Sequence, residues 1–280
     1  MNNTLFSALL FSGSLVAGLL GSLTGLGGGV VIIPLLTTAF GVDIRYAIGA
    51  SLVSVIACSS GSAGAYLREG FSNIRVGLLL EVATCLGALG GAALATHVPT
   101  AALAVLFGCV LLFSALVPAR HHAQSSLPSA CDPDSLATHW GLNGRYPTSQ
   151  GTVDYTVRRV PLGFGIMGIA GMLSGMLGIG SGAVKVLALD LAMGLPFKVS
   201  TTTSNFMIGV TAAASAGVYL HRGYIDPVLV MPVMLGVVAG SLGGARLLVK
   251  ADSDSLRKLF RVVIFALALE MIYSGLKRRI

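Results

Sequence analysis

The sequence predicts an all-α polytopic membrane protein built from two inverted-topology repeats, and three observations predict this fold class. Of 280 residues, 54% are hydrophobic and 10% are charged, with a mean hydropathy of +0.85, whereas roughly a quarter of the residues of a soluble protein are charged. Tracts 4–42 and 82–119 carry no Lys, Arg, Asp or Glu, and each exceeds the ~20 apolar residues that span a bilayer. The chain also has 37 glycines, which in membrane proteins mark close helix packing and broken helices.

The repeat is visible when the sequence is compared with itself at an offset of 153 residues. GLLGSLTGLGGGVV, from Gly18, then aligns without a gap with GMLSGMLGIGSGAV, from Gly171. The match continues to LGGA, which begins at Leu89 in one copy and at Leu242 in the other. Roughly a quarter of the aligned positions agree, so two copies of one unit are expected.

Each copy is predicted to contain five apolar helical segments. The second segment has about eleven residues, or roughly 16 Å of helix, against a hydrocarbon core of about 30 Å. It therefore either re-enters as part of a broken helix pair or crosses with a tilt. The predicted segments are 5–24, 30–40, 47–67, 76–96 and 101–118 in the first copy, and 160–177, 183–193, 199–220, 227–248 and 259–276 in the second.

The number of crossings and the basic residues predict the orientation. Three or five crossings per copy are both odd, so the second copy is inverted relative to the first. Twelve Lys and Arg residues fall on the face that holds the central loop and five on the other. Basic residues favour the cytoplasmic side, so the central loop is expected there and both termini outside. The organisation is residues 1–119, first membrane repeat; 120–157, hydrophilic connecting loop without periodicity; and 158–280, second membrane repeat.

Other classes of function have little support in the composition. The net charge of +7 comes from cations in short loops between apolar segments, as orientation signals do, and not from a patch that would bind nucleic acid. The four cysteines have neither disulfide nor metal-ligand spacing. No cofactor or metal site is predicted.

Two glycine-rich breaks predict an anion-binding site. The sequences GLGGG at 25–29 and GIGSG at 178–182 each separate an apolar helix from a half-length one. Irregular backbone at bilayer depth is tolerated where it lines a cavity or is buried in protein, and the start of a helix presents free N–H groups to an anion. Close packing of helices is the alternative explanation. The candidate residues are Gly27, Gly28, Gly29, Gly180, Ser181 and Gly182.

Lys185 is an unusual residue because it lies in the first turn of the second half-helix, where the helix dipole repels a cation. A compensating negative charge is expected: the transported anion, or a buried structural ion pair with Asp190 or Glu81. Intramembrane carboxylates often bind protons or ions, so Glu81 and Asp190 are ion-coupling candidates.

Polar runs open the third segment of each copy. Ser51 and Ser204 are equivalent in the repeat, and Asn205 follows Ser204. Their hydroxyl and amide donors are candidates for completing an oxyanion site beside the breaks. Alternatively, the hydroxyls bond their own helix or cap its start.

These residues resemble a known family. GLGGG and GIGSG, AIGASLVSV and TTTSNFMIG, and SAGAYLREGF and SAGVYLHRGYID together resemble the TauE/SafE sulfite exporter family of anion permeases. The resemblance spans both copies, from about residue 13 to 248, and departs in the central loop. It implies a multi-pass protein of the bacterial inner membrane that moves sulfite, sulfonate, sulfoacetate or a related small anion.

The leading hypothesis is a secondary transporter of small sulfur-containing anions, with a midplane site between the two breaks and alternating access by rocking of one copy against the other. A co-transported proton or sodium ion is a further expected partner. The alternatives are an anion channel and an intramembrane serine enzyme that uses Ser181 and His221.

Overall fold

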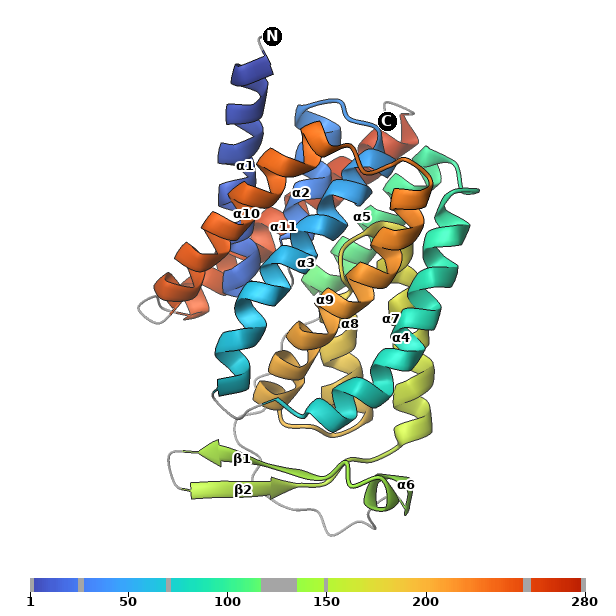
Figure 1. The fold of residues 1–280 in the computed structure, drawn as a ribbon, viewed down its shortest axis with the longest axis vertical. Coiled ribbons are helices and arrows are strands. Elements are labelled where there is room, and N and C mark those ends of the chain that lie inside the picture. Colours follow the sequence, from blue (N-terminus) through green and yellow to red (C-terminus); the bar gives the residue numbers. More distant parts are fainter. Residues whose placement is uncertain are drawn as a thin grey trace.

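The computed structural model describes residues 3–24, 28–68, 72–116, 135–148, 151–248 and 253–277. They form a bundle of α-helices with one small hairpin at its end, as Figure 1 shows. The first half contains α1 (Asn3–Thr24), α2 (Gly29–Pro34), the π-helical turn η1 (Leu35–Ala39), α3 (Ile44–Arg68), α4 (Ile74–Ala95) and α5 (Thr100–Leu116). The second half contains α7 (Val160–Leu177), α8 (Gly182–Leu187), the π-helical turn η2 (Ala188–Ala192), α9 (Phe197–His221), α10 (Pro227–Leu248) and α11 (Ser253–Leu276).

The two halves have the same order of elements with the same spacing. α2, η1, α3 and α4 begin and end 153 residues before α8, η2, α9 and α10, respectively, and α5 begins 153 residues before α11. In Figure 1, α1 runs from the N-terminal end of the bundle towards the hairpin end, whereas α7 starts beside the hairpin and runs the other way. α1 and α7 therefore point in opposite directions.

The halves interlock instead of standing side by side. α1 packs along α10 and α7 packs along α4, so each half gives its first helix to the fourth helix of the other. Glycines make both contacts close: a Cβ atom on Gly91 would lie 2.1 Å from the carbonyl oxygen of Met172, and one on Gly240 would lie 2.0 Å from that of Leu15. Small residues allow this approach of helix backbones in membrane proteins.

Two bundles result, and each mixes the halves. The first bundle is α1, α2, α3 and α10, and the second bundle is α7, α8, α9 and α4. They meet where α3 packs against α9, and α5 packs against α11 beside them. The glycines in α1, α4, α7 and α10 thus join helices within the bundles.

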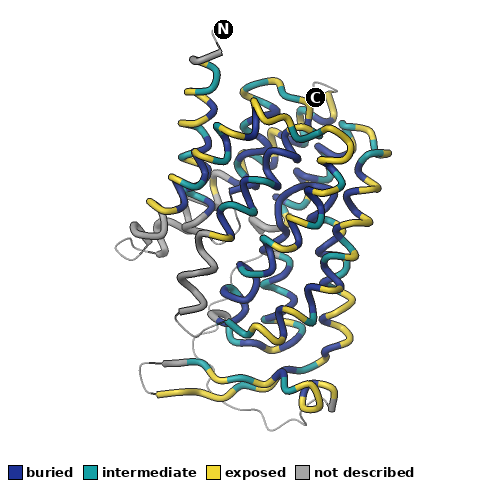
Figure 2. The backbone as a smooth tube through the Cα atoms, viewed as in Figure 1, coloured by how far each residue is buried: buried dark blue, intermediate teal, exposed yellow. Residues whose placement is uncertain are grey.

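The outer faces of the helices are apolar. Figure 2 shows buried residues in the middle of the bundle and exposed ones on the outward faces of the long helices. The exposed residues of α4 include Leu78, Val82, Leu86 and Leu89, which are spaced as one helix face. Within the described residues, α4 and α7 are long and apolar enough to cross a bilayer by length and composition. A face of this kind is suited to lipid contact.

The connecting segment departs from the prediction of a loop without regular structure, and the fold is not purely α-helical. It contains α6 (Ser135–His139), β1 (Gly144–Thr148) and β2 (Gly151–Tyr155), and the strands pair antiparallel from Gly144 with Tyr155 to Thr148 with Gly151. The Arg145 guanidinium and the Asp154 carboxylate form an exposed ion pair at 2.5 Å across the strands. Two five-residue strands are too short for periodicity to reveal, which is why the sequence did not predict them.

The hairpin is attached to the helices by a few polar contacts. Asn73, which caps α4, donates from Nδ2 to the Tyr155 hydroxyl and to the Leu142 carbonyl, both at 2.8 Å. Arg75 donates to the carbonyl oxygen of Gly141 at 3.0 Å. The hairpin therefore marks one end of the bundle, and both chain ends lie at the other (Figure 1).

Candidate functional site

The second glycine-rich segment is a turn of left-handed residues between two helices. α7 ends at Leu177 and α8 begins at Gly182. Between them Gly178, Gly180 and Ser181 have φ angles of 67°, 70° and 45°. Left-handed conformations suit glycine, but they cost a residue with a Cβ about 1 kcal/mol or more, so Ser181 occupies a strained position.

The first glycine-rich segment meets this turn. Gly29, the first residue of α2, lies so close that a Cβ atom on it would be 3.0 Å from the carbonyl oxygen of Gly178 and 2.4 Å from Ser51 Oγ. The Ser51 hydroxyl, fully buried on α3, donates to that same Gly178 oxygen at 2.8 Å. Gly28 is buried next to Gly29, and Gly27 lies outside the described residues. Gly28, Gly29, Ser51 and the turn at Gly178 therefore come together from different halves.

The polar start of α9 lies on the other side of the turn. The Ser204 hydroxyl donates to the carbonyl oxygen of Gly182 at 3.3 Å. Asn205 is 7% exposed, and its carbonyl oxygen accepts a hydrogen bond from Ser59 Oγ of α3 at 2.8 Å. The predicted residues Ser204 and Asn205 thus lie at the contact between α3, α8 and α9.

Ser181 carries an unsatisfied hydroxyl. Its side chain is 3% exposed, and its Oγ atom has no hydrogen-bond partner among the described residues. Ser174 Oγ, one turn before the end of α7, is in the same condition within that part of the chain. Buried polar atoms are almost always paired, so an unpaired hydroxyl beside the start of a helix is an available donor.

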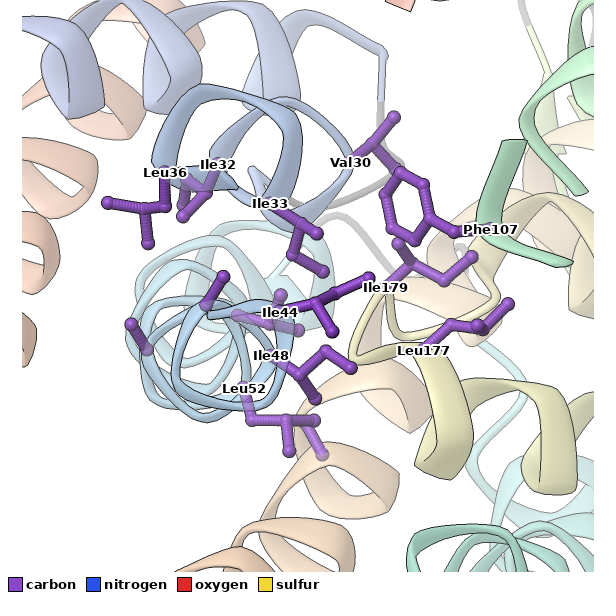
Figure 3. Close-up of a cluster of buried hydrophobic side chains, with 14 of the residues drawn as sticks. Val30, Ile32, Ile33, Leu36, Ile44, Ile48, Leu52, Phe107, Leu177 and Ile179 are labelled. Atoms are coloured by element: carbon purple, nitrogen blue, oxygen red, sulfur yellow. The ribbon is translucent and has the colours of Figure 1, made fainter. Parts of the chain in front are cut away.

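Apolar side chains enclose this region on one side. Val30 of α2, Phe107 of α5 and Ile179 of the turn lie together in the close-up of Figure 3, and they belong to one buried cluster. Ile48 of α3 packs against the turn as well, because a Cβ atom on Gly178 would lie 2.8 Å from its Cγ2 atom. A hydrophobic enclosure strengthens electrostatic interactions with a bound ion.

Lys185 lies one turn further along α8 and is fully buried. Its ammonium donates to the Thr211 hydroxyl at 2.5 Å and to the Met207 carbonyl at 3.3 Å, both on α9. Thr211 in turn donates to Glu81 Oε1 of α4 at 2.6 Å. Of the two carboxylates proposed as partners of Lys185, Glu81 is therefore the one linked to it, through a hydroxyl group.

Asp190 occupies a different environment from Glu81. It lies in η2, is partly exposed, and its carbonyl oxygen accepts a hydrogen bond from Gly194 N at 3.2 Å. Glu81 is 5% exposed and contacts Thr211 where α4 packs against α9.

Thr211 is the polar residue that sequence reasoning missed. It lies seven residues after Ser204 on α9, and therefore on the same face of that helix as the polar run at its start. That spacing was the available signal.

The structure does not bring the residues of the proposed serine enzyme together. His221 is exposed at the last residue of α9. The turn that holds Ser181 instead packs near the middle of α9, since a Cβ atom on Gly180 would lie 2.6 Å from Ile208 Cγ2. Thirteen residues of helix, about 20 Å, separate Ile208 from His221.

Known proteins match this chain over nearly its whole length. Residues 10–271 match the family model described as sulfite exporter TauE/SafE. The chain is 26% identical over 269 residues to the probable membrane transporter protein YunE of Bacillus subtilis, covering 94% of this chain and 96% of the relative.

Two further relatives are similar in extent. The probable membrane transporter protein YdhB of Bacillus subtilis is 28% identical over 230 residues, covering 82% of this chain and 85% of the relative. The probable membrane transporter protein MJ0441 of Methanocaldococcus jannaschii is 23% identical over 279 residues, covering 94% of each. No solved structure matches the chain. The helical fold with apolar outer faces and the match over 10–271 agree, and the protein belongs to the TauE/SafE sulfite exporter family of membrane transporters.

Proposed function

We propose that this protein is a secondary transporter, a permease or exporter, of small sulfur-containing anions such as sulfite, sulfonate or sulfoacetate, which bind between the two glycine-rich breaks. The family description names sulfite, and sulfonates carry a similar group of oxygens around sulfur. The observation that carries the proposal is the buried, unpaired Ser181 hydroxyl, located where both breaks and the start of α9 meet.

Backbone and hydroxyl donors would hold the anion at this place. The helical bonding of α8 begins with the Lys185 N–H, which donates to Ser181 O at 3.0 Å, so the N–H groups of the residues before it are free of helical bonds. They and the Ser181 hydroxyl suit a negatively charged oxygen. The Ser51 and Ser204 hydroxyls donate to the Gly178 and Gly182 carbonyl oxygens, so they would contribute by turning from these carbonyls to the anion. Asn205 is a further proposed donor, Gly28 and Gly29 lie at the start of α2, Gly180 and Gly182 flank Ser181, and Gly27 is proposed as part of the same site.

Alternating access would move the two bundles against each other. The opposite directions of α1 and α7 (Figure 1), together with element bounds that recur 153 residues apart, support an inverted-topology repeat. In such repeats the site lies at the midplane and two rigid parts rock around it. Because the closest glycine contacts bind α1 to α10 and α4 to α7, the rigid parts are the mixed bundles, and the site lies between them at α3 and α9.

The direction of transport depends on charge. An inside-negative potential drives an anion outward at about 2.3 kcal/mol per charge per 100 mV. Export therefore proceeds without a coupling ion, whereas import requires a co-transported cation. Glu81 and Asp190 are the carboxylates proposed to carry it.

Flux measurements in proteoliposomes test the proposal. Vesicles loaded with sulfite, methanesulfonate or sulfoacetate should release at least one of these anions and exchange it with the labelled anion outside. A negative interior should speed the release if the anion moves alone, and should have no effect if each monovalent anion moves with one cation. Saturable counterflow distinguishes a transporter from a channel, which would show conductance without counterflow. If none of the three anions moves, the proposed function is wrong.

A further inference from the structure

The inference rests on the proposed function and concerns the chain of polar contacts between α8, α9 and α4. We propose that Glu81 takes up and releases one proton in each transport cycle, and that this proton decides whether the charge of Lys185 is balanced by Glu81 or by the transported anion. The protein would then move one proton together with each monovalent anion.

The contact geometry leaves the two charges connected but separated. Lys185 and Thr211 are fully buried, and Glu81 is 5% exposed. The ammonium donates to the Thr211 hydroxyl, and the hydroxyl donates to Glu81 Oε1 at 2.6 Å. One hydroxyl group therefore stands between the cation and the anion, and the pair as a whole is neutral when both groups are ionised.

Glu81 has one open oxygen. Its Oε1 atom accepts from Thr211 and, at 3.5 Å, from the Cys85 thiol, whereas its buried Oε2 atom has no hydrogen-bond partner among the described residues. An ionised carboxylate is acceptor-only, with about four lone-pair positions. When a proton binds to Oε2, the carboxyl group is neutral and no unpaired negative charge remains on this buried oxygen. A sodium ion suits the place less, because hard cations need several oxygen ligands and the Lys185 ammonium is close.

The other half of the protein does without this polar chain. The residues 153 positions away from Lys185, Thr211 and Glu81 are Ile32, Cys58 and Met234. Ile32 and Cys58 are buried at the equivalent helix contact. Since the same architecture packs there with apolar side chains, the charges are not needed for packing. Buried ion pairs are in general no better for stability than apolar residues of similar volume, so function is the better explanation of this one.

The charge balance follows from the groups in contact. Among the described residues, the titratable side chains linked to Glu81 are Cys85 of α4 and, through Thr211, Lys185 of α8. α7 has no titratable residue, and those of α9, which are Lys198, Tyr219 and His221, lie near its ends. When one proton adds to Glu81 Oε2, the carboxyl becomes neutral and Lys185 keeps its three protons. The site then has one uncompensated positive charge, which a monovalent anion neutralises.

Wild-type protein in proteoliposomes gives the first test. The probe is the anion that shows counterflow, methanesulfonate being preferred because its charge does not change with pH. The membrane potential is clamped at zero and the outside is made one pH unit more acidic than the inside. The anion should then accumulate inside about tenfold, and a pH-sensitive dye inside the vesicles should record the entry of one proton per anion. A sodium gradient in place of the pH difference should accumulate none.

The outcomes separate the inference from the proposed function. Counterflow without pH-driven accumulation overturns the inference and leaves the transporter in place. Accumulation driven by sodium overturns the assignment to a proton. Absence of counterflow with sulfite, methanesulfonate and sulfoacetate overturns both.

Variants then assign the proton to Glu81. Glu81→Gln, which is permanently neutral, should retain counterflow and lose the pH-driven accumulation. The matched control is Glu270→Gln, an exposed carboxyl on α11, which should accumulate as the wild type does. Wild-type accumulation by Glu81→Gln overturns the inference, and if that variant does not fold, the Thr211→Ser and Thr211→Val pair decides. Thr211→Ser keeps the hydroxyl link, so the dependence of its transport rate on pH should match that of the wild type. Thr211→Val removes the link and should shift this pH dependence. If the two variants show the same pH dependence, the inference is overturned.

Discussion

Ser181 is held in a left-handed conformation with a buried hydroxyl that bonds to nothing in the described part of the chain. Two unfavourable features at one residue are typical of a functional position. The strain belongs to the backbone and would remain with any residue that has a Cβ atom. The unpaired hydroxyl belongs to serine alone.

Replacing Ser181 with alanine separates these two features. Ser181→Ala should leave thermal stability unchanged, because no hydrogen bond is lost. Its affinity for the transported anion should fall by at least about tenfold, since hydrogen bonds to charged groups contribute about 1.5–3 kcal/mol. Anion binding and melting of the purified protein check both expectations. Ser12→Ala, at an exposed serine that bonds only within α1, is the control, and equal affinity in the two variants would contradict the assignment.

Lys185 and Glu81 should show strong coupling in stability. Removing one member, by Lys185→Ile or Glu81→Met, leaves the other buried and unbalanced, which typically costs about 3–5 kcal/mol. The double variant copies the apolar residues Ile32 and Met234 of the other half and should recover most of this loss. Thermal unfolding of the three variants in detergent measures the coupling. A double variant whose loss of stability equals the sum of the two single losses would show that the sites act independently.

For individual residues, the sequence was enough to identify Lys185 and Glu81 as candidates, but not to predict that the two are linked by hydrogen bonds. Spacing along one chain left Asp190 and Glu81 as equal partners, because the choice depends on how α4 packs against α9. That packing brings Thr211 between Lys185 and Glu81. It results from contacts among several helices, which no local pattern records.

Among the elements, the long helices and the half-length segments were predictable, because apolar runs of helix length end at glycine and proline. The predicted segments 30–40 and 183–193 correspond to α2 with η1 and to α8 with η2. Their division into an α-helical and a π-helical turn was not predicted, since one extra residue per turn leaves no mark in composition. The hairpin of β1 and β2 was missed because its strands are short.

Gly91 should be essential to the contact between α4 and α7, whereas its neighbour Gly90 should not. A Cβ atom on Gly91 would lie 2.1 Å from the Met172 carbonyl oxygen, and one on Gly90 meets nothing within 4 Å. Gly91→Ala must push the helices apart and should destabilise the protein by about 1–3 kcal/mol or more. Gly90→Ala should be neutral or slightly stabilising. Melting temperatures of the two variants check this prediction, which fails if both behave alike.

In the whole molecule, the hairpin lies at one end of the bundle and both chain ends at the other (Figure 1). The excess of basic residues on the hairpin face predicts that this end is cytoplasmic. An alkaline phosphatase fused after Ile280 should be active in cells, and a green fluorescent protein fused there should be dark. The same reporters inserted between β1 and β2 should give the opposite result. If the same reporter is active both after Ile280 and between β1 and β2, the predicted orientation is contradicted.

The exchange of partners between the halves determines when the protein can finish folding during its synthesis. α1 is synthesised well before the helix it packs along, α10, which begins at Pro227. Most of the chain must therefore leave the ribosome before α1 can dock, and contacts so distant in sequence form slowly. Neither half should accumulate when expressed alone, because the helices that pack along α1, α4 and α5 of the first half all belong to the second half. Expressed together from separate messages, split within residues 120–134, the two halves should rescue each other, and co-purification through a tag on one of them measures this.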